Sequence, residues 1–258
     1  MGVMVVLKPV LLQIGTIKIR WYGLLIVASI FISLFIINKL LKKEKFVEFE
    51  FFLDFLIYGI PISILGARLY YVLFNYKYYF KNPELIFSIW RGGLAIHGAI
   101  FSGAAVLYYL SRKRNVSFLK LLDIISPALA FGQSVGRWGN FFNREAYGRI
   151  VSLEYINHFP DFLKKQMYIG GTYREPTFLY ESLFNLILFF CLMIYYNFSD
   201  KDGNTFAYYL LFYSSARYVI EDFRVDSLML ADFQVAQLVS ISLIMMSLFI
   251  IVKNSTNN

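Results

Sequence analysis

The sequence has very few of the residues that form disulfides and bind metals. Its 258 residues include one cysteine and two histidines, which excludes a disulfide framework and offers no spaced cluster of metal ligands. Cys191 lies in the apolar run LILFFCLMIYY and is expected to face lipid or the core. There is no G-x-S-x-G motif, and no serine in the polar runs has an obvious histidine partner, which disfavours serine hydrolysis. The sequence therefore predicts a protein that works without a metal or another cofactor.

Charged residues are also scarce. They make up 16% of the chain, against about 25% in a typical soluble protein, whereas hydrophobic residues make up 58%. The mean hydropathy is +0.56, so the sequence predicts an integral membrane protein. Most lysines and arginines lie in short loops between apolar runs. We therefore expect the net charge of +8 to attract anionic membrane lipid and not nucleic acid.

Apolar runs recur from the first fifty residues to the last twenty. A bilayer-spanning helix needs about 20 predominantly apolar residues, and seven segments are candidates: 21–41, 51–74, 92–110, 119–138, 178–197, 205–221 and 233–252. No Pro/Gly/Ser-rich linker divides them. We predict an all-α integral membrane protein, with residues 1–258 in a single membrane domain of about seven transmembrane helices in one bundle. A short extracytoplasmic loop region is expected at about 140–177.

The basic loops predict the orientation of these helices. The clearest are NKLLKKEK at 38–45 and SRKRN at 111–115, and both follow odd-numbered crossings. The positive-inside rule places them in the cytoplasm. We therefore expect a multi-pass membrane protein with its N-terminus outside and its C-terminus in the cytoplasm.

Polar residues gather in three runs beside or within the apolar segments. These runs are GRWGNFFNREAYG at 136–148, WRGGLAIHGAIFSG at 90–103 and RYVIEDFRVD at 217–226. A charge in mid-bilayer costs at least about 2.5–3.5 kcal/mol, so such residues are functional candidates. Arg217, Glu221 and Arg224 are spaced four and three apart, which stacks them on one helix face. Two cations around one carboxylate predict a net positive site.

Each of these residues also has a structural interpretation. The spacing of Arg217, Glu221 and Arg224 also fits a ladder of structural ion pairs. His97 also fits a histidine that is hydrogen-bonded in the core. Arg68 and Asp54 fit ordinary helix-helix pairs, and Glu181 fits a residue favoured by the helix dipole. Their occurrence together at one depth favours a functional site. Several arginines without a nucleophile are suited to holding a phosphate, because the guanidinium fork binds phosphate at two points and does not deprotonate. A phospholipid head group is the expected ligand.

At these residues the chain resembles the prolipoprotein diacylglyceryl transferase family. GRWGNFFNREAYG is similar to that family's signature G-R-x-G-N-F-x-N-x-E-x-x-G. The stretches IGTIKIRWYGLL, GARLYYVLF, GGLAIHG, PTFLYES and RYVIEDFR follow in the family's order, so the resemblance covers almost the whole chain. There are departures: Phe178 replaces a frequent glutamine, Ala99 and Ala236 replace glycines, and Asp226 follows Arg224 by two residues instead of three.

The resemblance implies a reaction. The diacylglyceryl group of phosphatidylglycerol is transferred to the lipobox cysteine thiol in the signal peptide of a preprolipoprotein, which forms a thioether and releases glycerol phosphate. This is the first step of bacterial lipoprotein maturation, so the resemblance also implies a protein of the bacterial cytoplasmic (inner) membrane. The thiol, with a pKa of about 8.5, must lose a proton to attack. Arginines would stabilise the charge that gathers on the phosphate leaving group.

The resemblance also suggests roles for particular residues. His97, Arg137 and Arg217 are the expected catalytic residues: the two arginines contact the phosphate, and His97 is the leading general base. The expected substrate-binding residues are Tyr22, Arg68, Asn140, Asn143, Glu145, Glu221 and Arg224. Among these, Arg224 and Glu221 form a supporting pair, Asn140, Asn143 and Glu145 orient the glycerol end, and Tyr22 donates a hydrogen bond. The glycines of the signature are expected to allow close backbone approach where the helix breaks.

Two other functions are compatible with the same residues. A carrier for an anionic lipid or solute would bind through the arginines without breaking a bond. A membrane scaffold would tolerate replacement of the polar residues. The family resemblance favours the enzyme.

Overall fold

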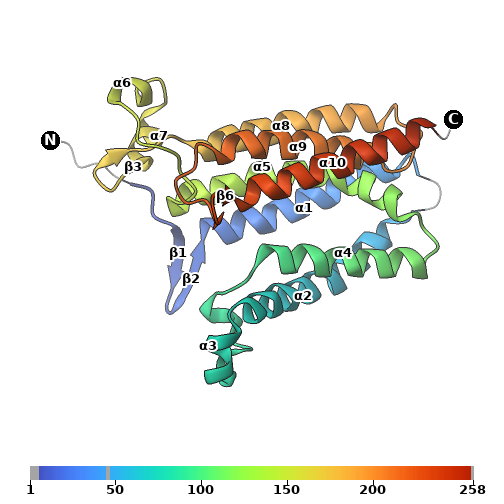
Figure 1. Ribbon diagram of the computed structural model, residues 1–258, viewed down its shortest axis with the longest axis horizontal. Coiled ribbons are helices and arrows are strands. Elements are labelled where there is room, and N and C mark those ends of the chain that lie inside the picture. The colour runs from blue at the N-terminus through green and yellow to red at the C-terminus, as the bar shows by residue number, and fades with distance from the viewer. Residues whose placement is uncertain (1–5, 45–46, 257–258) are drawn as a thin grey trace. The chain divides into compact units, whose positions relative to one another are not determined.

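The computed structural model describes residues 6–44 and 47–256 and is mostly helical (Figure 1). Each predicted crossing corresponds to a long helix. These helices are α1 (Trp21–Leu41), α2 (Phe49–Phe74), α4 (Ile96–Lys113), α5 (Phe118–Asn143), α8 (Thr177–Tyr196), α9 (Asn204–Glu221) and α10 (Val235–Thr256). The shorter helices are α3 (Tyr76–Lys81), η1 (Pro83–Leu85), η2 (Ile89–Arg91), α6 (Leu153–Ile156) and α7 (Asp161–Gln166).

The prediction of a helical membrane protein is confirmed, but in the described residues three antiparallel hairpins accompany the helices, which an all-α protein would lack. They pair β1 (Val10–Ile14) with β2 (Ile17–Arg20), β3 (Tyr168–Ile169) with β4 (Thr172–Tyr173), and β5 (Met229–Leu230) with β6 (Phe233–Gln234). All three turn at residues with positive φ: Gly15 in β1–β2, Gly170–Gly171 in β3–β4 and Ala231 in β5–β6. Such short strands are set by turn geometry, which composition and hydropathy do not reveal.

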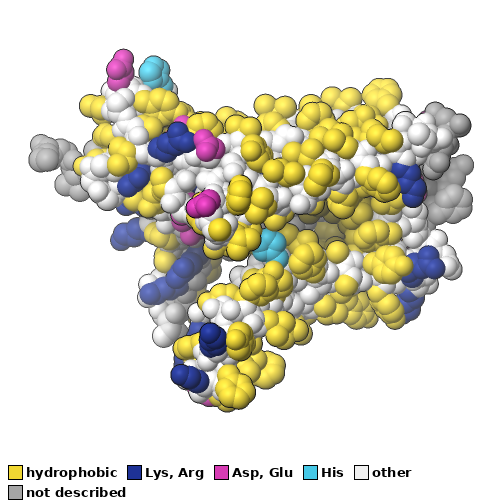
Figure 2. All heavy atoms as spheres, viewed as in Figure 1, with side chains coloured by type: hydrophobic (Ala, Val, Ile, Leu, Met, Phe, Trp, Pro, Cys, Tyr) yellow, Lys and Arg dark blue, Asp and Glu magenta, His cyan; other side chains and the backbone are white. Residues whose placement is uncertain are grey.

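Five helices are long and apolar enough to cross a membrane in the described part of the chain: α1, α2, α5, α8 and α10. The chain is therefore a multi-pass membrane protein. Helices α4 and α9 have 18 residues each and lie where crossings were predicted. Their tyrosines, serines and charged residues keep them out of this group, so the count of seven crossings is not confirmed. Apolar side chains cover most of the face seen in Figure 2, as expected for helices that face lipid.

The chain forms two compact units. Unit 1 comprises Met1–Ile37 and Leu122–Asn258, and unit 2 comprises Asn38–Leu121. In unit 2, α2 packs closely against α4, because glycines face each other. A β-carbon at Gly98 would lie 2.4 Å from the carbonyl oxygen of Gly66. Small residues of this kind allow two helix backbones to approach in a membrane.

In unit 1, α9 packs between α8 and α10. Helix α5 is joined to α8 by reciprocal hydrogen bonds: Ser134 Oγ donates to the carbonyl of Ser182 (2.8 Å), and Ser182 Oγ donates to the carbonyl of Ser134 (2.9 Å). Helix α1 reaches α5 through the stacked rings of Trp21 and Phe142. This packing brings the end of α5, the start of α8 and the end of α9 together.

The predicted loop at 140–177 is a folded segment. It contains α6, α7 and the β3–β4 hairpin. Phe141, Ile156, Leu163, Met167 and Phe178 form a buried cluster beneath it, so the segment has a core of its own. Phe178, which departs from the family pattern, is 2% exposed and belongs to this core.

Candidate active site

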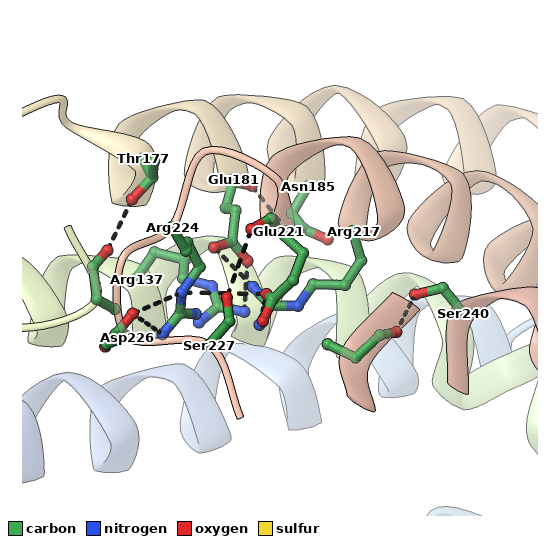
Figure 3. Close-up of polar contacts among 12 residues, drawn as sticks. Arg137, Thr177, Glu181, Asn185, Arg217, Glu221, Arg224, Asp226, Ser227 and Ser240 are labelled. Atoms are coloured by element: carbon green, nitrogen blue, oxygen red, sulfur yellow. Dashed lines mark hydrogen bonds and ion pairs between the residues drawn. The ribbon is translucent and has the colours of Figure 1, made fainter. Parts of the chain in front are cut away.

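A buried carboxylate joins two of the predicted site arginines (Figure 3). Glu181 of α8 is 2% exposed, and its Oε2 atom lies 2.5 Å from Nη2 of Arg137 in α5. Its Oε1 atom accepts a 3.0 Å hydrogen bond from Nη1 of Arg217 in α9. One carboxylate therefore holds the guanidinium groups of two helices close together.

The ion pairs continue beyond Arg217. Its Nη2 atom lies 2.5 Å from Oε2 of Glu221, one turn later in α9. The same oxygen lies 4.0 Å from Nε of Arg224, which follows the helix. Arg224 donates two hydrogen bonds, of 3.0 and 2.9 Å, to Oδ1 of Asp226. Arg217, Glu221 and Arg224 do pair, but the prediction that all three stack on one helix face is wrong, because α9 ends at Glu221. Asp226 pairs with Arg224 despite its altered spacing.

The site carries no net formal charge, so the prediction of a net positive site is wrong. Three arginines alternate with three carboxylates, and the prediction counted neither Glu181 nor Asp226 among the charges of the site. The signal for Glu181 is its position as the one charged residue in the apolar sequence of α8. Because arginines occupy these carboxylates, the site is unsuited to a metal. In the described residues there is also no group of three or more metal-ligating side chains.

Arg137 has the most unused hydrogen-bonding capacity of the three arginines. A guanidinium has five N–H donors, and Glu181 is the only ion-pair partner of Arg137 within the described residues. Its side chain is 20% exposed, compared with 16% for Arg217 and 12% for Arg224. An anion entering the site would therefore find the most free donors on Arg137.

The signature run remains helical up to Asn143, so the expected helix break near its glycines is wrong. Its first residues form the last two turns of α5. Close approach does occur at Gly139, where a β-carbon would lie 2.2 Å from Cδ2 of Tyr22. A β-carbon at Gly136 would meet nothing within 4 Å. Gly139 thus allows the ring of Tyr22, which was predicted to bind substrate, to lie against the helix that carries Arg137.

Two asparagines and a glutamate form a polar cluster at the end of α5. Glu145 Oε1 accepts hydrogen bonds from Nδ2 of Asn140 (2.9 Å) and Nδ2 of Asn143 (3.2 Å). The Oδ1 atom of Asn143 is buried without a partner in the described part of the chain. This oxygen and Glu145 Oε2 are acceptors suited to ligand hydroxyl groups. The structure thus brings together the three residues predicted to orient a glycerol.

The last glycine of the signature lies beside Arg224. Gly148 forms an isolated antiparallel bridge with Arg224, and its N–H donates to the carbonyl of Glu175 (2.9 Å). A β-carbon here would lie 2.9 Å from both Cβ of Glu175 and Cγ2 of Thr177. Glycine is needed for this close contact, which joins the signature to the start of α8, while the backbone bridge joins it to Arg224.

His97 belongs to unit 2, whereas the arginine site belongs to unit 1. It lies in the first turn of α4 and is half-buried, and its ring centroid lies 6.1 Å from that of Tyr70. Its assignment as the general base stays a prediction.

Arg68, also in unit 2, binds mainly backbone carbonyls. It is 5% exposed and donates four hydrogen bonds, to the carbonyls of Leu85, Ile86, Gly92 and Gly93. These bonds fix the loop between α3 and α4 and leave one of its five N–H donors. A cavity of about 440 Å³ lies beside it. The assignment of Arg68 to substrate binding stays a prediction, and its contacts show a structural role.

Comparison with known proteins agrees with the family resemblance. Residues 9–253 match the family described as prolipoprotein diacylglyceryl transferase. Proteins named phosphatidylglycerol–prolipoprotein diacylglyceryl transferase are similar over nearly the full length. The one from Streptococcus mutans is 42% identical over 98% of this chain and 97% of its own. That from Clostridium novyi is 43% identical over 98% of both chains, and that from Listeria monocytogenes is 42% identical over 95% and 89%.

Proposed function

The chain belongs to the prolipoprotein diacylglyceryl transferase family, and on this premise we propose that Arg137 and Arg217 bind the phosphate of its lipid substrate. The protein is a membrane transferase of lipoprotein maturation. It moves the diacylglyceryl group of phosphatidylglycerol to the lipobox cysteine thiol of a preprolipoprotein and releases glycerol phosphate. The observation that supports the phosphate site is the sharing of Glu181 by the two arginines.

The shared carboxylate gives the two guanidinium groups a fixed spacing before substrate arrives. Donors that are already in place need no reorganisation when charge develops on the leaving phosphate, which is why such sites stabilise transition states. Arg137 offers the free donors, and Arg217 is held from both sides by Glu181 and Glu221. Arg224 and Asp226 form the last ion pair of the site, and Arg224 helps to keep the Glu221 carboxylate in place.

The glycerol head group is assigned to the polar cluster at the end of α5. Its hydroxyl groups donate to the unpaired oxygens of Asn143 and Glu145, while Asn140 holds the glutamate. Tyr22 lies against Gly139 on the same helix and donates its hydroxyl hydrogen to the substrate. These residues set the position of the scissile carbon–oxygen bond relative to the arginines.

The attacking thiol must lose its proton before the thioether forms. We assign this role to His97, because histidine is the side chain that most often serves as a general base in enzymes. The sulfur then bonds to the glyceryl carbon, the carbon–oxygen bond to phosphate breaks, and the electron pair leaves with glycerol phosphate. Water or the substrate phosphate is the alternative base.

The membrane arrangement is part of the same proposal. Residues 1–258 form one membrane domain of seven crossings, in which α4 and α9 also span the bilayer. The protein lies in the bacterial inner membrane with the N-terminus and residues 144–176 outside. The arginine site then lies near the outer surface, where the signal peptide of the preprolipoprotein presents its cysteine.

Incubation of the purified protein with phosphatidylglycerol and a lipobox peptide tests the reaction. Mass spectrometry should show a diacylglyceryl mass on the peptide cysteine and glycerol phosphate in solution. A peptide with serine in place of cysteine should stay unmodified. A carrier would bind the lipid without releasing glycerol phosphate, and that result would contradict the proposal.

A further inference from the structure

Glu145 lies in a strained turn. The residues on either side of it, Arg144 and Ala146, both have φ of 55°, in the left-handed region that side chains other than glycine rarely adopt. Such strain persists only when surrounding contacts impose it, and it is concentrated at functional sites. The contacts that hold this turn are therefore informative.

Arg144 holds the first side of the turn through its side chain. Its Nε atom donates a 3.1 Å hydrogen bond to the carbonyl of Gln166, and its Nη2 atom donates to the carbonyl of Tyr168. The guanidinium thus binds backbone at the end of α7 and the start of β3. Arg144 was not among the predicted site residues.

The acceptor segment is itself fixed to α5. Gln166 is 1% exposed, and its Nε2 atom donates to the carbonyls of Phe141 (3.1 Å) and Phe142 (3.4 Å) in the last turn of α5. Its amide also pairs with both the N–H (3.0 Å) and the carbonyl (3.2 Å) of Leu7. The backbone that Arg144 binds is therefore itself held by hydrogen bonds to α5 and to Leu7.

The second side of the turn is held by α8. Thr177 Oγ1 is buried and donates a 2.7 Å hydrogen bond to the carbonyl of Ala146, and Ala146 is 7% exposed. Glu145, between these two fixed residues, is exposed. The backbone is therefore fixed on both sides while the carboxylate remains open to a ligand.

We propose that Arg144 is a positioning residue, which holds the strained turn so that the Glu145 carboxylate stays beside Asn140 and Asn143. This inference rests on the proposed function, in which Glu145 binds the glycerol head group. A displacement of about 1 Å in a positioning group is enough to slow an enzyme about a hundredfold. The strained turn therefore supports a high reaction rate, because it keeps the Glu145 carboxylate in one position.

A double-mutant cycle tests the proposal. Arg144→Met should lower kcat about tenfold while KM for phosphatidylglycerol changes less than threefold, and Arg144→Lys should recover part of the loss. In an Arg144→Met, Glu145→Gln double variant, activity should equal that of Glu145→Gln alone, because Arg144 acts through that carboxylate. Independent effects would instead multiply, and multiplication would overturn the proposal.

Ala146→Gly relieves the backbone strain at position 146 and leaves the Arg144 guanidinium unchanged. Glycine accepts positive φ freely, so the melting temperature should stay the same or rise, while kcat falls severalfold because Glu145 moves more freely. A merely structural role would not raise stability and lower kcat together. Unchanged kcat in this variant would contradict the proposal. Lys164→Met, which removes an ion pair to the exposed Asp161 in the same segment, is the control and should change neither quantity.

Glu145→Gln separates this inference from the function on which it rests. If Glu145→Gln has normal activity, the glycerol-binding role of Glu145 is wrong and Arg144 has nothing to position. If Glu145→Gln is slow but Arg144→Met is normal, the binding role stands and only the positioning role fails.

Discussion

The ring of Tyr22 lies so close to Gly139 that a single added carbon would overlap it, at 2.2 Å from Cδ2. The Tyr22 ring, in the first turn of α1, therefore packs directly against the backbone of Gly139, in the penultimate turn of α5. Because Tyr22 is proposed to contact substrate, a change at Gly139 should affect both packing and turnover.

Gly139→Ala should lower stability by about 1–3 kcal/mol, as overpacking usually does, and should reduce turnover at least tenfold by displacing the Tyr22 ring. Gly136→Ala is the matched control on the same helix. A methyl group there meets nothing within 4 Å, and alanine favours a helix interior by up to about 1 kcal/mol. Melting in detergent and the peptide assay measure both. Equal turnover in the two variants would show that the contact with Tyr22 does not matter.

Arg137→Lys and Arg217→Lys test phosphate binding by the guanidinium fork. Lysine keeps the charge and loses the planar two-point geometry. Removal of one donor from such a site commonly costs about a hundred- to a thousandfold in rate, or about 2.7–4 kcal/mol. We expect losses of this size in folded protein, with Arg112→Lys close to wild type. Full turnover in Arg137→Lys would reduce Arg137 to a structural ion-pair partner.

Glu181→Gln removes the carboxylate that Arg137 and Arg217 share. Breaking a buried ion pair on one side usually costs about 3–5 kcal/mol, because the other charge stays buried. We expect a loss of stability of this order together with slower turnover. Asp226→Asn is the comparison, since its side chain is 48% exposed and exposed pairs contribute at most about 1 kcal/mol. Similar melting temperatures for the two variants would contradict the bridging role of Glu181.

Thiol labelling tests the orientation of the chain in the membrane. In a Cys191→Ser background, a cysteine at Glu154 should react with an impermeant reagent added to intact cells, and one at Lys43 should react only after lysis. These positions lie in α6 and directly after α1. The reverse pattern would place the arginine site on the cytoplasmic side.

The sequence predicts the long helices well and their ends less well. The segment expected at 92–110 begins only at Ile96, because Gly92 and Gly93 have positive φ values of 83° and 73° that a right-handed helix excludes. The segment expected to end at 138 continues to Asn143. Hydrogen bonds from Gln166 to the last carbonyls of this helix support its end, and such distant partners cannot be read from local sequence.

The candidate site could also be predicted only in part, because contacts within one helix follow from sequence spacing and contacts between distant segments do not. Arginine spacing within one helix identifies the pairing of Arg217 with Glu221, since helix geometry alone brings them together. The contact of Glu181 with Arg137 joins two helices, and no spacing rule predicts it. Arg144 lies inside the signature, but only the structure shows that its side chain binds Gln166 and Tyr168.

The ion pairs of the arginine site carry no net charge, and this has a consequence for how tightly a phosphate is held. An incoming phosphate does not meet a bare cluster of cations, because each guanidinium already has a carboxylate partner. In the proposed function the phosphate therefore binds through the N–H donors that the carboxylates leave free, and the nearby carboxylates lower the net attraction of the site for an anion. If the arginines bind the phosphate as proposed, Glu181 and Glu221 thus weaken the hold of the site on glycerol phosphate and favour its release after the reaction.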